Sequence, residues 1–133
     1  MEDAVHLDEI GQVALTVTNL KEAKVFYREV LGMRFLFEAG TMAFFQCGSV
    51  RLMIGTADAA DASRQPFGTI LYFRVADLKA TCATLKNNAV AMVQEPHLVA
   101  RMRSHDLWMA FIEDPSGNTL GLMSEVIRPD SLS

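Results

Sequence analysis

Two similar stretches decide the order of the structural elements: VALTVTNLKEA at residues 13–23 and LYFRVADLKAT at residues 71–81. They match at an offset of 58 residues (75 minus 17), which places Val17, Leu20 and Lys21 over Val75, Leu78 and Lys79. In both stretches alternating apolar residues give way to apolar residues at helical spacing. Each half of the chain is therefore predicted to begin with a strand and a helix. The ranges are strand 10–18 and helix 20–31, then strand 69–75 and helix 77–87.

Three short strands are predicted after each helix, and Met42-Ala43-Phe44 of the first half returns as Met109-Ala110-Phe111 in the second. The predicted strands are 33–38, 42–47 and 50–55, then 89–94, 107–113 and 119–125. This order predicts an α+β fold, a single domain of two tandem βαβββ modules at residues 10–55 and 68–125, with a linker at 56–67 and a tail at 126–133. The stretch 95–106 has no counterpart in the first half and is expected to form an extra hairpin or loop.

The composition excludes several classes of protein. Half of the 133 residues are apolar, which argues against disorder, and 12 basic against 16 acidic side chains argue against a nucleic-acid partner. No apolar run approaches the length of a membrane span, and the acidic N-terminal sequence does not resemble a signal peptide. We therefore expect a cytoplasmic protein that binds small molecules, with Cys47 and Cys82 as reduced thiols.

Four segments in a fixed order resemble the vicinal oxygen chelate superfamily, which contains glyoxalases, bleomycin-resistance proteins and extradiol dioxygenases. They are IGQVALTV from Ile10, FYREVLGMRF from Phe26, ILYFRVADL from Ile70 and DPSGNTLGLM from Asp114. In the last segment Pro115 fixes φ, Gly117 allows a positive φ, and Asp114 and Asn118 can bind the turn backbone. The resemblance implies that the two modules form an open, curved barrel around a cavity and that the protein is a homodimer.

Strand alternation predicts which residues face that cavity. In the first strand Val13, Leu15 and Val17 form an apolar set that should pack under the helix, and the strands at 50–55, 69–75 and 119–125 divide in the same way. The residues of the opposite face are the candidates for ligand binding. With the aromatic residue of the unrepeated stretch, the candidates are Gln12, Arg51, Met53, Ile70, Tyr72, Arg74, Trp108, Gly121 and Met123.

The resemblance also identifies where metal-using members carry their ligands, one on each of four strands. The matching positions here are Gln12, Met53, Ile70 and Gly121. Only the Gln12 amide has an oxygen suited to a divalent cation, and a single ligand does not hold one. We therefore expect no metal cofactor.

Two histidines flank the unrepeated stretch. If His97 and His105 lie over the cavity with Trp108, they could contact a ligand or act as acid and base; otherwise the stretch is a surface hairpin with Trp108 in the core. Two hypotheses follow: a metal-free protein that binds or sequesters an aromatic or amphipathic compound, as drug-binding members of the superfamily do, or a lyase, isomerase or dioxygenase-type enzyme with a non-standard site at His97 and His105. A metal-dependent enzyme with other ligands is a third.

Overall fold

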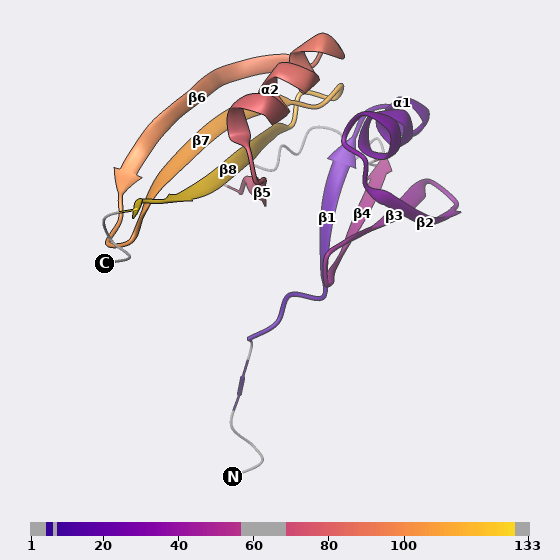
Figure 1. Ribbon diagram of the computed structural model, residues 1–133. Coiled ribbons are helices and arrows are strands. Elements are labelled where there is room, and N and C mark those ends of the chain that lie inside the picture. The colour runs from indigo at the N-terminus through magenta and orange to yellow at the C-terminus, as the bar shows by residue number, and fades with distance from the viewer. Residues whose placement is uncertain (1–4, 7, 57–68, 130–133) are drawn as a thin grey trace. The chain divides into compact units, whose positions relative to one another are not determined.

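The chain divides into two units, residues 1–66 and 67–133. The computed structural model describes residues 5–6, 8–56 and 69–129 of the chain (Figure 1). Each unit contains one four-stranded sheet and one helical segment, so the predicted α+β class and the repeat of βαβββ modules are confirmed. No helix among the described residues is long and apolar enough to cross a membrane.

The first unit has the strand order β1-β4-β3-β2. Its elements in chain order are β1 (Gln12–Val17), α1 (Leu20–Val25), η1 (Phe26–Val30), β2 (Arg34–Ala39), β3 (Met42–Cys47) and β4 (Val50–Thr56). Strands β1 and β4 run parallel, whereas the other neighbours are antiparallel. The predicted linker begins one residue early, because Thr56 still belongs to β4; the rest of it lies outside the described residues.

The helix of the first unit begins and ends at the predicted residues but changes its winding. The Asn19 side chain accepts a hydrogen bond from the Glu22 backbone N–H at 2.9 Å, which caps the first turn. Gly32 follows the last turn with a φ of 73°, a conformation that glycine adopts without strain. From Phe26 onward the helix is a π-helix, which a hydrophobic pattern does not distinguish from an α-helix.

The second unit repeats this topology with the strand order β5-β8-β7-β6. Its elements are β5 (Leu71–Arg74), α2 (Leu78–Asn87), β6 (Ala91–Arg101), β7 (His105–Glu113) and β8 (Thr119–Ile127). Asp77 caps α2 by accepting from the Ala80 N–H at 3.1 Å. The cap therefore stands at the position that matches Asn19 of the first unit.

The unrepeated stretch 95–106 lengthens two strands of the second unit. Strand β6 continues to Arg101 and β7 starts at His105, so most of the stretch belongs to one long curved hairpin (Figure 1). The register of this hairpin shifts at three places, as bulges do when they bend a strand. Strand β8 likewise continues to Ile127, two residues into the expected tail. The unrepeated stretch 95–106 therefore extends the sheet through the hydrogen bonds between β6 and β7.

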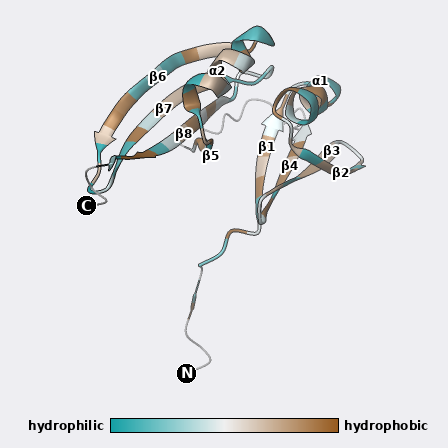
Figure 2. Cartoon of the chain, in the orientation of Figure 1, coloured by the Kyte–Doolittle hydropathy of each residue, from teal (hydrophilic) through white to brown (hydrophobic). Residues whose placement is uncertain are grey.

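Each core lies between a sheet and its own helix. In the first unit Tyr27, Phe45 and Ile54 are fully buried, and in the second Ile112 and Leu120 are. Along β6 in Figure 2 a polar run at residues 94–97 separates two apolar runs at residues 91–93 and 98–100. Of the apolar sets predicted to pack under the helices, Val17, Leu52 and Leu122 are buried, whereas Val13 and Leu71 are half-buried. We call the opposite side of each sheet its open face.

Candidate functional site

The open face of the first unit carries three of the predicted ligand-binding residues. The cross-strand register pairs Gln12 with Arg51 and Ala14 with Met53, so all of these residues share one face. The Gln12 Nε2 and Met53 Sδ atoms lie 4.0 Å apart. The prediction that Gln12, Arg51 and Met53 share a face is therefore confirmed, and within this unit they are neighbours.

An aromatic pair lies beside Met53 on the same face. Phe44 of β3 is the cross-strand partner of both Met53 and Phe37. The rings of Phe37 and Phe44 are stacked, with 4.5 Å between their centroids and 19° between their planes. The Arg51 guanidinium lies 5.9 Å from the Phe44 ring centroid. The stacked rings cover each other's facing sides and offer their edges and remaining faces as apolar surface, with the Arg51 cation nearby, so an aromatic compound can pack against them.

The open face of the second unit also has an aromatic pair, in which Phe111 matches Phe44, whereas Tyr72 lies on β5, the counterpart of β1. Tyr72, Gly121 and Phe111 are consecutive cross-strand neighbours, and the two rings meet edge to face at 5.8 Å. A Cβ atom added to Gly121 would lie 2.4 Å from Cδ2 of Tyr72, so the tyrosine ring covers this glycine. Two residues farther along these strands, the cross-strand partners Arg74 and Met123 lie on the same face.

Sequence reasoning missed the two phenylalanines that stand at the centre of these pairs. Phe44 and Phe111 are the last residues of the repeated Met-Ala-Phe triplet, and in each unit they lie on the open face. The triplet indicated their equivalence, and strand alternation at these positions would have placed them opposite the buried Ala43 and Ala110 neighbours.

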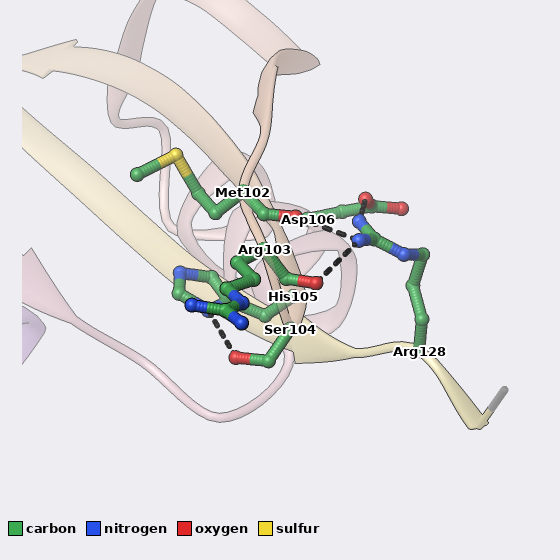
Figure 3. Close-up of polar contacts among 6 residues, drawn as sticks. All are labelled: Met102, Arg103, Ser104, His105, Asp106 and Arg128. Carbon is green, nitrogen blue, oxygen red and sulfur yellow. Dashed lines mark hydrogen bonds and ion pairs between the residues drawn. The ribbon is translucent and has the colours of Figure 1, made fainter. Parts of the chain in front are cut away.

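A charged cluster lies farther along the open face of the second unit. The Glu125 carboxylate lies 3.4 Å from Arg74 Nε and 3.4 Å from His105 Nε2. The His105 Nδ1 atom lies 3.4 Å from the hydroxyl of Ser104 (Figure 3). Glu125 was not predicted as a site residue, although alternation from Met123 places it on this face. Its charge offsets that of Arg74.

Asp106, which follows His105 in the chain, belongs to a different contact. Asp106 accepts a hydrogen bond from Arg128 Nη1 at 2.5 Å, and Nη2 of Arg128 donates to the carbonyls of Met102 and Arg103 at 2.6 and 3.0 Å (Figure 3). In Figure 3 the His105 and Asp106 side chains extend in opposite directions, as adjacent strand residues do. Through these hydrogen bonds Arg128 stabilises the turn between β6 and β7.

The remaining candidates take separate positions. His97 is the cross-strand partner of Met109 on the open face, and its Nδ1 lies 2.9 Å from the Glu95 carbonyl. Ile70 precedes β5 and is exposed. Trp108 requires a correction: it lies on the helix-covered face, where Lys79 Nζ of α2 stands 5.5 Å from its ring centroid. Trp108 and Phe111 are three residues apart on β7, so they lie on opposite faces, and Trp108 is separated from the candidates of the open face.

The four positions that match the family's metal ligands do not form a set of metal donors. They present an amide, a thioether, an aliphatic side chain and a glycine that the Tyr72 ring covers. Within residues 5–6, 8–56 and 69–129, no three His, Cys, Asp or Glu side chains gather closely enough to hold an ion.

The fold places the chain in the class of proteins that contain two βαβββ modules, each with one helix-covered and one open sheet face. The sequence matches the Glyoxalase/Bleomycin resistance protein/Dioxygenase superfamily over residues 9–122, and the chain belongs to this superfamily. None of the curated proteins matches the chain.

Three solved structures illustrate how varied similar proteins are. A lactoylglutathione lyase from Agrobacterium tumefaciens is 22% identical, with a TM-score of 0.68 and coverage of 88% of this chain and 93% of that one. The antibiotic-binding protein TnmS3 from a Streptomyces species is also 22% identical, with a TM-score of 0.70 and coverage of 92% and 99%. A superfamily member from Sphaerobacter thermophilus is 18% identical, with a TM-score of 0.74 and coverage of 90% and 98%. At these identities the likeness establishes the fold alone.

Proposed function

We propose that this protein binds a planar aromatic or amphipathic small molecule and does so without a metal ion. The observation that carries the proposal is that each open face has an aromatic pair: Phe37 with Phe44 in one unit and Tyr72 with Phe111 in the other. Tyr72 and Phe37 are each close to half exposed, at 44% and 45%, so their rings offer apolar surface to a ligand. Rings and thioethers together make an adaptable apolar surface.

The same positions support the metal-free part of the proposal. In a metal-using member each of the four positions would need an imidazole or carboxylate, and Gly121 has no room for either while the Tyr72 ring lies over it. An antibiotic-binding protein and a lyase are equally distant from this chain in sequence, so their names do not decide between binding and catalysis. The donor chemistry of this chain's own residues favours binding.

Ligand binding is tested by a thermal-shift screen of two- and three-ring aromatic compounds, followed by calorimetry of the hits. Removing one ring, as in Phe44→Ala or Tyr72→Ala, should weaken binding of a hit by up to about tenfold, because an aromatic contact contributes roughly 0.5–1.5 kcal/mol. Lys79→Ala, which changes the helix-covered face of the second unit, is the matched control and should leave the affinity unchanged. The proposal fails if no aromatic compound binds.

Metal content is measured separately by mass spectrometry of the purified protein. We expect no stoichiometric metal. One tightly held Zn, Ni, Mn or Fe per chain would contradict the proposal and favour the metal-dependent enzymes of the superfamily.

A second candidate function is acid-base catalysis of a lyase or isomerase type, favoured by the contact between His105 and Glu125. A carboxylate beside an imidazole nitrogen can orient the ring, as a partner residue does for a general acid or base. Turnover of a hit that disappears in His105→Gln or His97→Gln would establish this function. Unchanged affinity in these variants, with no turnover by the wild type, would exclude it.

We also propose that the protein is a homodimer, as the resemblance to the superfamily implies. Light scattering coupled to size-exclusion chromatography should return about twice the chain mass of 14.7 kDa. A mass of one chain at all concentrations would contradict it.

A further inference from the structure

The open face of the first unit is divided into a polar row and an apolar row that run across all four strands. The register places Arg34, Gln46, Arg51 and Gln12 side by side from β2 to β1. The neighbouring row, two residues along each strand apart from one bulge in β2, contains Phe37, Phe44, Met53 and Ala14. Within this sheet, basic and amide groups therefore adjoin aromatic rings and a thioether.

The polar row is positively charged and carries no carboxylate. Among the described residues no Asp or Glu forms an ion pair with Arg34 or Arg51, and both arginines are exposed. The carboxylate of the β2 strand, Glu38, is on the opposite face, where it contacts Lys24 at 2.5 Å. The second unit differs, because Glu125 offsets the charge of Arg74. Arg34 and Arg51 therefore make the first unit the more attractive one for an anion.

The spacing of the two rows fits a small aromatic anion. Neighbouring strands lie about 4.8 Å apart, and residues two apart along a strand are separated by roughly 6.6 Å. A fused two-ring compound with one anionic substituent covers about one such step. Its rings can therefore pack against the stacked Phe37–Phe44 pair while the anionic group reaches Arg51. Guanidinium groups bind carboxylate and phosphate oxygens in a planar, two-point geometry.

We infer that the ligand of this protein is a planar aromatic anion whose charged group is bound by Arg51 and Arg34. The inference rests on the proposed function, since it assigns the chemical class of the ligand and the part of the open face that selects it. Arg51 is the principal contact, because it stands beside both the Phe44 ring and the Gln12 amide. Arg34, two strands away, adds charge on the other side of Gln46.

The test compares three probes of the same shape by calorimetry on the full chain: 2-naphthoate, 2-naphthyl phosphate and the neutral 2-naphthamide. Wild-type protein should bind at least one anion about tenfold more tightly than the amide, as expected for a charge-assisted hydrogen bond. Arg51→Gln should remove most of this preference, and the double variant Arg34→Gln/Arg51→Gln should remove it entirely. Affinity for the amide should stay within about twofold. Arg51→Lys should restore part of the preference, because it keeps the charge but loses the planar geometry.

The control variant is Arg28→Gln, which removes the same charge from the same unit but on the helix side, where Arg28 stands 5.3 Å from the Phe35 ring centroid. It should leave all three affinities unchanged. Circular dichroism and urea midpoints verify that each variant is folded. The ratio of the naphthoate and naphthyl phosphate affinities shows whether the site prefers a carboxylate or a phosphate.

The possible failures are distinguishable. Equal binding of the amide and both anions would overturn the inference and leave the proposed function standing. A preference for anions that survives in Arg34→Gln/Arg51→Gln would overturn the placement of the charged group on this row. Absence of binding by all three probes would overturn the inference and, if the wider aromatic screen also fails, the proposed function.

Discussion

Replacing Gly121 by alanine is expected to destabilise the protein, although alanine is normally better than glycine inside a strand. The backbone of Gly121 is not in the left-handed region that favours glycine, so only the surrounding space disfavours a side chain. The added Cβ would meet Cδ2 and Cε2 of Tyr72 at 2.4 and 2.6 Å. Carbon atoms normally approach to about 3.5–4.0 Å, so the ring has to move by roughly 1 Å or more.

The expected size of the effect follows from three terms. Moving the ring disturbs its edge-to-face contact with Phe111, worth roughly 0.5–1.5 kcal/mol, and overpacking a fitted site costs about 1–3 kcal/mol in total. Alanine in place of glycine returns about 0.5–1 kcal/mol through backbone entropy. Gly121→Ala should therefore lower the free energy of unfolding by about 1–2 kcal/mol.

The decisive comparison is a double-mutant cycle with Tyr72→Ala. Without the ring nothing opposes the new Cβ, so Gly121→Ala should stabilise the Tyr72→Ala protein by about 0.5–1 kcal/mol, and the sign of its effect should reverse. Urea unfolding followed by circular dichroism measures all four proteins. Gly55→Ala is the matched control in the first unit: its Cβ would meet Met42 Cγ at 3.2 Å and the Thr41 carbonyl oxygen at 3.3 Å, both longer than the contacts at Gly121, so the cost should be smaller. Additive effects of the two substitutions would refute the packing of Tyr72 over Gly121.

Three further predictions concern the framework of the two modules. Burial raises the pKa of the Cys82 thiol, and the nearby Glu95 charge raises it further, so a thiol reagent at neutral pH should label Cys47 readily and Cys82 only after unfolding; equal native rates would contradict this. Asp106→Asn should weaken the fastening of the β6–β7 turn and increase tryptic cleavage there severalfold, whereas an unchanged rate would show that the ion pair does not hold the turn. Removing either helix cap, by Asn19→Ala or Asp77→Ala, should cost about 1 kcal/mol in urea unfolding, and a cost in only one of them would speak against equivalent caps.

The turn before β8 shows how far short-range pattern can predict structure. The Asp114 carboxylate accepts from the backbone N–H groups of Ser116 and Asn118 at 2.9 and 2.8 Å, and Gly117 has a φ of 87°. Each of these features was predicted from DPSGN, because the interactions join residues within four positions of each other. The two faces of the first and last strands of each half were predicted for the same reason.

Other features of the candidate site depend on partners that are distant in the sequence. The lengths of β6 and β7 are set by pairing across their hairpin, and no local signal at Glu95 or Asp106 marks an end. Glu125 joins Arg74 and His105 only because β8 lies between β5 and β7. Trp108 was assigned to the ligand-binding set from its residue type, and the register places it under α2 instead.

The repeated modules, their order of elements and the buried face of four strands could be predicted from the sequence alone, because hydrophobic period and turns act over a few residues. Only the tertiary structure decided which side chains stand next to one another on the open faces. Strand order and register bring Arg34, Gln46, Arg51 and Gln12 into one row and lay Tyr72 over Gly121. These neighbours are made by ladder pairing between strands that are far apart in the chain, and a linear pattern does not encode that pairing.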